Sequence, residues 1–319
     1  MSFGEEYLVH PDLFPARLAG EPWGSAELVL DLAGGPYVFS GLATPQAEWL
    51  RARYAGFVAA SAAPAPAVRC AAFRMAPEEF RPIDLRGREL TFDRDYQEDA
   101  VRFVGVDLLA RLAWRGDGLR AAFWTSTEDP ASFHGALENV FRVLVAYRAL
   151  DLGGALFHSA GIAPRSGEDS PAMVCCGASG AGKSTLSRLA AEAGQHVASD
   201  DLNAVLPDDG GARLFPVPFA GDFVPATWSP ASRPLAGFCR LGKGLEESLK
   251  PLGRAAVLST LVACSPYVNT DPFRADRLLS NLDRLLDSTP AYQLIFALEG
   301  TAPGLLAGAH EQPALTTLR

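Results

Sequence analysis

The chain lacks a long hydrophobic run. Its longest nearly apolar stretch covers residues 255–264 and is already interrupted by Ser259 and Thr260. A helix that spans a bilayer needs about 20 apolar residues, so we expect no membrane-spanning segment and no membrane partner. The chain begins MSFGEEYLVH, which is acidic where a secretory signal is basic and has no apolar core. These absences favour a cytoplasmic location.

Positive charge and cysteine are also scarce. The chain has 28 Lys and Arg against 37 Asp and Glu, a formal net charge of −9. A sequence-independent grip on nucleic acid needs a basic face, so we expect no nucleic-acid partner. The five cysteines are odd in number and contain no Cys-x-x-Cys pair, which fits thiols in a reducing compartment better than disulfides or a zinc site. They are Cys70, Cys175, Cys176, Cys239 and Cys264.

A length of 319 residues is enough for about two domains. The first part predicts strands and turns: one hairpin joins residues 26–32 to 36–42, and another joins 101–114 to 119–124 through a turn at 115–118. An Ala- and Pro-rich loop covers residues 59–68, and a strand can resume at 68–75. No motif that carries chemistry occurs before about residue 150. We therefore predict a β-rich accessory or partner-binding domain over residues 1–130 and a second domain over residues 131–319.

The second domain opens with a predicted helix, capped by Ser132 and ended by Gly153-Gly154. A hairpin of residues 155–163 and 171–176 follows. If Ala163 pairs with Ala172 in this hairpin, His158 lies opposite Gly177. The imidazole could then bind phosphate or orient reacting groups; the alternative is a half-buried strand histidine with one backbone hydrogen bond.

The segment after this hairpin matches the P-loop pattern G-x-x-x-x-G-K-[ST]. An apolar strand precedes it and an amphipathic helix, residues 183–193, follows it. Its glycines let backbone N–H groups surround a phosphate, Lys183 reaches the β- and γ-phosphates, and the Ser184 hydroxyl ligates Mg²⁺. No Asn-Lys-x-Asp motif for guanine is present, so ATP is favoured over GTP. The predicted nucleotide-binding residues are Gly177, Ala178, Ser179, Gly180, Ala181, Gly182, Lys183, Ser184 and Thr185.

Two consecutive carboxylates, Asp200 and Asp201, follow one helix beyond the P-loop. Neighbouring residues near a strand end point to opposite faces. One carboxylate can therefore meet Mg²⁺ while the other takes the proton of an acceptor hydroxyl. The alternative is an Asp-Asp turn or helix cap, which is a common structural role.

Three segments together, LFHSAGIA, GASGAGKST and VASDDLNAV, resemble the HPr kinase/phosphorylase family over about residues 150–225. The resemblance implies an α/β fold: a phosphoenolpyruvate carboxykinase-like P-loop kinase domain with a mixed sheet, here preceded by a smaller β-rich domain. It also implies that Lys183 and the P-loop amides hold ATP, and that Ser184 and Asp201 hold Mg²⁺. Asp200 is then the base for a serine hydroxyl, and His158 lines the γ-phosphate site.

The sequence departs from this family at Ala178, where an Asp is usual, and at Thr185, where a Glu is frequent. The expected acceptor is therefore a serine of a protein or peptide other than HPr. Related kinases assemble, so a homo-oligomer is compatible with the resemblance. Two alternatives are a small-molecule kinase of the adenylylsulfate or sugar type, and a nucleotide-gated binding module without turnover.

The rest of the chain adds weaker candidates. Residues 215–223 predict a loop that is either part of the active site, with Asp222 as an extra metal-binding candidate, or an ordinary surface loop. A strand at 234–241, an amphipathic helix at 274–286 and a final strand at 290–298 follow. Four cations could clamp the transferring phosphoryl group or, as the alternative, carry solvated surface charge: Arg240, Lys243, Arg274 and Arg277.

Overall fold

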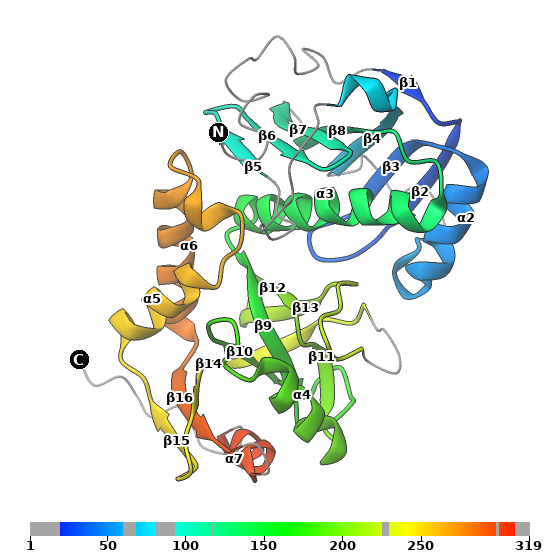
Figure 1. The fold of residues 1–319 in the computed structure, drawn as a ribbon. Helices are drawn as coiled ribbons and strands as arrows, with labels where there is room; N and C mark the ends of the chain where they lie inside the picture. The colour runs from blue at the N-terminus through cyan, green and yellow to red at the C-terminus, as the bar shows by residue number, and fades with distance from the viewer. Residues whose placement is uncertain are drawn as a thin grey trace. The chain divides into compact units, whose positions relative to one another are not determined.

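The computed structural model describes residues 20–59, 68–80, 93–115, 118–224, 230–297 and 300–309. The chain is a mixed α/β protein with two mixed β-sheets, each in its own compact unit, residues 1–144 and 145–319 (Figure 1). The predicted boundary at residue 130 falls where helix α3 starts, whereas the units divide inside that helix. Most of the predicted loop at 59–68 and the centre of the turn at 115–118 lie outside the described residues.

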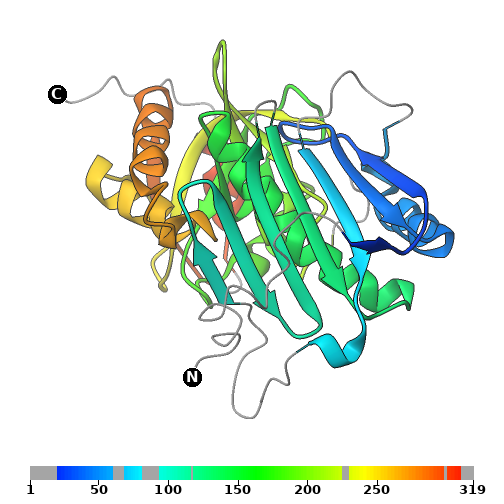
Figure 2. The ribbon, with the colours of Figure 1, turned by 90° about the horizontal axis from the view of Figure 1, so that it is seen from above.

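The first unit contains one β-sheet, which agrees with the β-rich region predicted there. Its strand order is β2-β3-β4-β8-β7-β6-β5, with β1 paired to β4 (Figure 2). The pairs β3–β4 and β4–β8 are parallel, and the others are antiparallel. The strands are β1 (Glu21–Pro22), β2 (Ala26–Leu30), β3 (Tyr37–Leu42), β4 (Val68–Arg74), β5 (Asp93–Tyr96), β6 (Ala100–Gly105), β7 (Leu108–Arg115) and β8 (Gly118–Thr125).

The predicted hairpin at 26–42 is confirmed as the antiparallel pair β2–β3. The prediction of a single strand over 101–114 is wrong, because that segment forms two strands, β6 and β7, around a turn at Val106 and Asp107. Asp107 has a φ of 50°, and its carboxylate accepts hydrogen bonds of 2.8 Å from the Thr125 hydroxyl and the Ser126 N–H. Because apolar residues continue on both sides of this turn, the hydrophobic pattern of the sequence does not indicate where the strand is interrupted.

Of the helices described at residues 44–151, the sequence predicts only α3. Helix α2 (Thr44–Arg53) and the short 3₁₀ turns η2 (Ala55–Phe57) and η3 (Pro77–Glu79) were not expected. Helix α3 (Pro130–Asp151) was expected, but its cap is Asp129, whose carboxylate accepts hydrogen bonds from the N–H and hydroxyl of Ser132 at 2.9 and 3.0 Å. Ser132 is therefore the donor at this helix start and not the cap. Gly153, at a φ of 84°, ends α3 as predicted.

The second unit contains a ring of paired strands. Strand β10 pairs with β9 and β14, β9 pairs with β12, and β12 pairs with β13, which returns to β14. Strands β16 and β15 extend the sheet from β14. The strands are β9 (Ala155–Ala163), β10 (Ala172–Cys176), β11 (His196–Ser199), β12 (Leu202–Asp208), β13 (Gly211–Pro216), β14 (Arg233–Lys243), β15 (Ser248–Pro251) and β16 (Ala291–Phe296).

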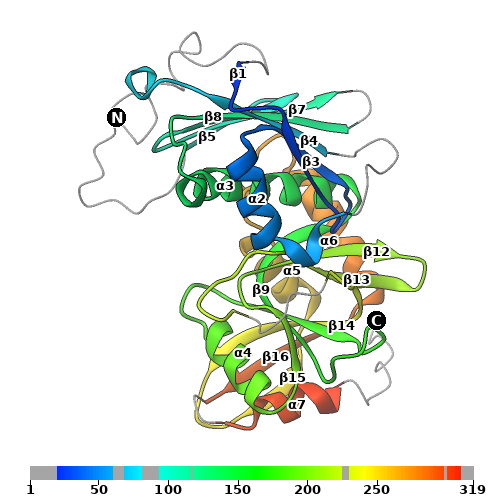
Figure 3. The same ribbon diagram turned by 90° about the vertical axis from the view of Figure 1, so that its right-hand side faces the viewer.

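Helices pack on this ring and bury an apolar core. Helix α4 packs against α7 and β9, and α5 packs against α6 (Figure 3). The core includes Leu186 and Ala190, which lie on the predicted apolar face of the P-loop helix. The helices are α4 (Lys183–Glu192), α5 (Arg254–Ala263), the 3₁₀ turn η4 (Val268–Thr270), α6 (Ala275–Ser288) and α7 (Ala302–Ala309).

The predicted elements after the P-loop are confirmed with small differences. Strand β14 covers its predicted segment, helix α6 is shifted by one or two residues toward the C-terminus, strand β16 is shorter than predicted, and α7 follows it. Within the amphipathic helix predicted at 274–286, Leu279 is 41% exposed, because the buried stripe of α6 runs through Leu278, Leu282 and Leu285. None of the helices in the described ranges is long and apolar enough to span a bilayer.

The hairpin before the P-loop has the predicted register. Met173 pairs with Ile162 and Cys176 pairs with Ser159. His158 and Gly177 are the next residues beyond this last pair. Strand β9 is paired on its other side with β11 and β12, where Leu202 is opposite His158. The imidazole and the start of the P-loop therefore lie at one end of the same hairpin.

Arg274, a candidate phosphate clamp, is instead part of a buried ion pair. Its Nη1 donates to Asp271 Oδ2 at 2.8 Å, and the Tyr147 hydroxyl donates to the same oxygen at 2.8 Å. Asp271 is fully buried. Arg277, another candidate clamp, pairs with Asp151 at 2.9 Å. Both arginines therefore stabilise the packing of α6, and neither lines the cavity described below.

We expect Asp271→Ala to lower the free energy of unfolding by about 3–5 kcal/mol, because it leaves the buried Arg274 guanidinium without its counter-charge. Urea denaturation monitored by circular dichroism measures this change. Asp209→Ala is the control, because Asp209 is exposed and surface substitutions usually change stability by less than about 0.5 kcal/mol. A loss below about 1 kcal/mol at Asp271 would contradict the assigned role.

Candidate functional site

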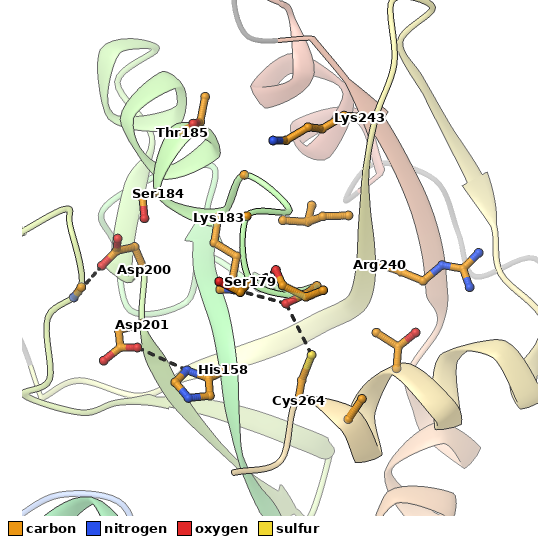
Figure 4. A pocket seen from close by; sticks show the side chains of 18 of the residues that line it. His158, Ser179, Lys183, Ser184, Thr185, Asp200, Asp201, Arg240, Lys243 and Cys264 are labelled. Carbon is orange, nitrogen blue, oxygen red and sulfur yellow. Dashed lines mark hydrogen bonds and ion pairs between the residues drawn. The ribbon is translucent and has the colours of Figure 1, made fainter. Parts of the chain in front are cut away.

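The second unit contains a cavity of about 1050 Å³ beside the P-loop (Figure 4). It brings together the motifs that the sequence placed in three separate segments. One side is formed by the P-loop and the Asp pair, and the other by β14 and the end of α5. The lining residues are His158, Gly177, Ala178, Ser179, Gly180, Gly182, Lys183, Ser184, Thr185, Asp200, Asp201, Gly221, Asp222, Arg240, Leu241, Lys243, Ser259, Thr260, Ala263 and Cys264.

The P-loop has the backbone that its glycines predict. Gly180 and Gly182 have φ angles of 74° and 104°, which side-chain-bearing residues rarely adopt. A Cβ on Gly182 would lie 2.7 Å from the Phe296 ring, so both space and conformation require glycine there. The first turn of α4 has no side-chain cap. Its N–H groups and the positive end of its dipole are therefore suited to an anion.

Lys183 bridges the two ends of the P-loop. Its Nζ donates hydrogen bonds to the carbonyl oxygens of Gly177 at 3.1 Å and Ala178 at 3.4 Å. Eight of the nine predicted nucleotide-binding residues line the cavity; the exception is Ala181, which packs against the hydrophobic core. The ammonium group is thus held at the mouth of the loop, where it can exchange carbonyl partners for phosphate oxygens.

Asp200 is almost completely buried, at 2% exposure. It lies in the short interruption between β11 and β12. Its Oδ1 accepts the N–H of Gly221 and its Oδ2 accepts the N–H of Phe223, each at 3.0 Å. Asp200 therefore fixes the loop after β13, which the sequence predicted as an active-site loop, and brings Asp222 to the cavity wall.

Asp201 faces His158 across the strand pair. Its Oδ1 lies 3.3 Å from His158 Nδ1, and its backbone carbonyl accepts the N–H of Ser159 at 3.0 Å. The His158 side chain is 45% exposed, so it is reachable from the cavity. In Figure 4, Asp201 points toward His158, while Asp200 and Ser184 point into a different part of the cavity. The adjacent carboxylates therefore have different neighbours.

Two of the four candidate cations line the cavity, Arg240 and Lys243 of β14. Arg240 is oriented by Gln293 of the neighbouring strand β16: Arg240 Nε donates to Gln293 Oε1, and Gln293 Nε2 donates back to the Arg240 carbonyl at 2.9 Å. Figure 4 shows Arg240 on the side of the P-loop away from Asp200. Arg240 and Lys243 thus remain candidates for phosphate or acceptor contacts, and Arg274 and Arg277 do not.

Helix α5 contributes cavity residues to which the sequence analysis gave no role. Ser259, Thr260 and Ala263 of α5 and its C-cap residue Cys264 line the cavity. The two hydroxyl residues are the ones that interrupt the apolar run at 255–264. This interruption of the apolar run is the feature of the sequence that indicates a polar surface on the helix.

The donor set fits a divalent cation that is bound mainly through phosphate. Within the described ranges, no group of three or more His, Cys, Asp and Glu side chains could hold a metal ion by itself. Mg²⁺ commonly binds through one or two carboxylates together with substrate phosphates and water. A serine hydroxyl at the start of α4 and carboxylates in the same cavity supply ligands of that kind.

Comparison of the chain with known protein families finds no match. A search of curated proteins also finds no matching relative.

Proposed function

We propose that the second unit is an ATP- and Mg²⁺-dependent kinase that transfers the γ-phosphate to a serine hydroxyl of a protein or peptide. In this proposal it is an HPr-kinase-like enzyme with a phosphoenolpyruvate carboxykinase-like P-loop domain. The observation that carries the proposal is that one cavity is lined by the P-loop, both carboxylates and His158. These are the parts that phosphoryl transfer needs: a phosphate cradle, a metal ligand and a proton acceptor.

The P-loop residues would hold the triphosphate. Eight residues of this loop, the lysine Lys183 among them, line the cavity in which the β- and γ-phosphates would lie. Phosphoryl transfer needs little covalent chemistry from the protein, so positioning and electrostatic stabilisation account for most of the rate. The P-loop is held between β10 and α4, whose side chains pack in the hydrophobic core, so it can position the phosphates rigidly.

In this proposal, one carboxylate of the Asp pair binds the metal ion and the other is the base. The resemblance to the HPr kinase family gives Asp200 the base's role and Asp201 the metal's. The contacts favour the reverse division, because both oxygens of Asp200 already accept backbone N–H groups and Asp200 points to the same part of the cavity as Ser184. Bound Mg²⁺ supplies charge neutralisation of the phosphates, and Ser184 and Asp200 would hold it.

Asp201 is then the proposed base for the acceptor hydroxyl. It lies beside His158, and each of these two groups can exchange a proton with the other or with an acceptor. A serine side chain that enters between this pair and the P-loop lysine would place its hydroxyl near both the carboxylate and the transferred phosphate. This arrangement requires an acceptor that extends out of the cavity, as a protein or peptide does.

His158→Ala should lower the rate of phosphoryl transfer more than it lowers ATP affinity, because the imidazole lies beside the carboxylate of Asp201, the proposed base. We expect kcat to fall by about 10²- to 10⁴-fold, as for loss of one positioned acid–base group, with the Kd for ATP changed much less. Single-turnover transfer and nucleotide titration measure the two quantities. An equal loss in both would place His158 at the nucleotide rather than at the acceptor. His196→Ala is the control, because His196 does not line the cavity.

The test of the proposed function is incubation with γ-labelled ATP, Mg²⁺ and the proteins or peptides encoded beside this chain. Label on a serine supports the proposal, and replacement of that serine by alanine should remove the label. Label on a small metabolite would replace the proposal by a small-molecule kinase. Tight nucleotide binding without label on any acceptor would indicate a nucleotide-gated binding module.

A further inference from the structure

Two cysteines meet at the point where the P-loop leaves the sheet. Cys176 is the last residue of β10 and directly precedes Gly177, and Cys264 is the C-cap of α5. Their side chains are hydrogen-bonded to each other. Cys264 Sγ also lies 3.8 Å from the Gly177 carbonyl oxygen, to which it donates. The two thiols, distant in sequence, are therefore in contact beside the phosphate cradle.

The two thiols differ in access. Both are buried, Cys264 at 5% and Cys176 at 1% exposure, but Cys264 lines the cavity and Cys176 does not. A small reagent in the cavity therefore reaches the Cys264 sulfur first. A bound nucleotide would fill the same cavity and cover that sulfur.

The thiols also differ in acidity. The hydrogen bond from Cys176, helped by the Gly177 backbone and the charges of Lys183 and His158, lowers the pKa of Cys264 to about 7. The hydrogen bond to Cys264 and burial raise the pKa of Cys176 well above its usual value. The thiolate is the reactive form of cysteine. The sulfur of Cys264, which lines the cavity, is thus the nucleophile, and the sulfur of Cys176 is its neighbouring partner, an arrangement that favours disulfide formation.

We propose that Cys264 and Cys176 form an oxidation-sensitive site, at which a hydroperoxide converts the two thiols to a disulfide and thereby weakens nucleotide binding. Regulation of nucleotide binding rests on the proposed function, but the oxidation itself does not.

The chemistry uses one hydroperoxide for each thiol pair. The Cys264 thiolate attacks a peroxide oxygen, the O–O bond breaks, and a sulfenic acid forms with release of water or an alcohol. The Cys176 sulfur then attacks the Cys264 sulfur, the S–O bond breaks and water leaves with the Cys176 proton. The two thiols lose two electrons, and the peroxide gains them.

The disulfide would act on the nucleotide site through two contacts. It removes the S–H donor of the Gly177 carbonyl, which also accepts Lys183. It also moves Cys264 toward β10, and the Cys264 carbonyl holds the backbone N–H of His158 at 2.7 Å. Oxidation therefore alters the start of the P-loop and the position of His158 together.

The second unit contains another pair of neighbouring cysteines, which serves as an internal control for the Cys176–Cys264 pair. Cys175 and Cys239 are directly opposite in the parallel strands β10 and β14, and their thiols are also in contact. Both are at most 1% exposed, and neither lines the cavity. They share proximity with the first pair but lack its access to the cavity.

The experiment treats the reduced full chain with hydrogen peroxide, blocks remaining thiols with N-ethylmaleimide and maps the cross-linked peptides by mass spectrometry. We expect a Cys176–Cys264 disulfide, at least tenfold weaker ATP binding after oxidation, and recovery with dithiothreitol. Saturating ATP with Mg²⁺ should slow the oxidation by at least tenfold. Cys264→Ala should remove the effect of peroxide on binding, and the matched variant Cys239→Ala should retain it.

Three results would overturn the proposal: both thiols still react with N-ethylmaleimide after peroxide, the disulfide joins Cys175 and Cys239 instead, or ATP affinity is unchanged by the Cys176–Cys264 cross-link. The mapping uses the unaltered chain, so it decides the first two even if a variant does not fold. A reduced protein that binds no nucleotide would overturn the regulation together with the proposed function, while the mapping still reports the disulfide by itself.

Discussion

Replacing Lys183 by alanine should abolish phosphoryl transfer and weaken ATP binding strongly. The ammonium group is the charged donor of the P-loop and is held at its mouth by two carbonyl oxygens. Removing one donor that stabilises transition-state charge typically lowers kcat by about 10²–10³. Charge-assisted hydrogen bonds contribute about 1.5–3 kcal/mol each, so the Kd for ATP should rise by about 10- to 100-fold. Calorimetric titration and a transfer assay measure the two effects.

Lys250→Ala is the control for this substitution, since Lys250 is an exposed residue of β15 and the change in net charge is the same. It should leave both quantities unchanged. ATP affinity that stays within a factor of two in Lys183→Ala would remove the P-loop from nucleotide binding, and with it the proposed function.

The second large effect is expected at the Asp pair, where the two asparagine variants should fail differently. Asp201→Asn removes the proposed base but keeps the side-chain size, so transfer should fall by about 10²–10⁴ while ATP affinity changes little. Asp200→Asn should raise the Mg²⁺ concentration needed for half-maximal activity. It also puts an amide where two backbone N–H groups need an acceptor, so the loop at 221–223 should become more sensitive to proteolysis.

Measuring transfer against Mg²⁺ concentration for both variants separates the two assignments. If Asp200→Asn loses transfer at every Mg²⁺ concentration and Asp201→Asn is rescued by added Mg²⁺, the roles are those implied by the family resemblance. If both variants are fully active, neither carboxylate takes part and the pair is a structural turn. Asp209→Asn, on an exposed turn, controls for the change in charge.

The sequence predicts those features that depend on local pattern. The P-loop follows from glycine conformation and the positions of Lys183 and Ser184, all within one short segment. The register of the β9–β10 hairpin follows from two apolar strands around one loop, and it correctly placed His158 beyond the last strand pair, next to Gly177. In both cases neighbouring residues fix the geometry, so little information from the rest of the chain is needed.

The features that the sequence missed depend on distant segments. The donors to Asp200 come from a loop about 20 residues away in the chain, and the α5 wall of the cavity lies still farther along. The closure of the strand ring through β13 and β14 also joins strands that have no shared turn. In the first unit, the turn at Asp107 was missed because its fixing hydrogen bonds come from β8 and the segment after it.

Strand β9 has hydrogen-bonded neighbours along both of its edges near His158, with β10 on one and β11 and β12 on the other. A main chain held from both sides has already lost its conformational entropy when the protein folds. The imidazole and the segment that carries the carboxylates therefore need little reorganisation when a ligand binds. Because little binding free energy is lost to reorganisation, differences in contacts between acceptors translate into differences in affinity.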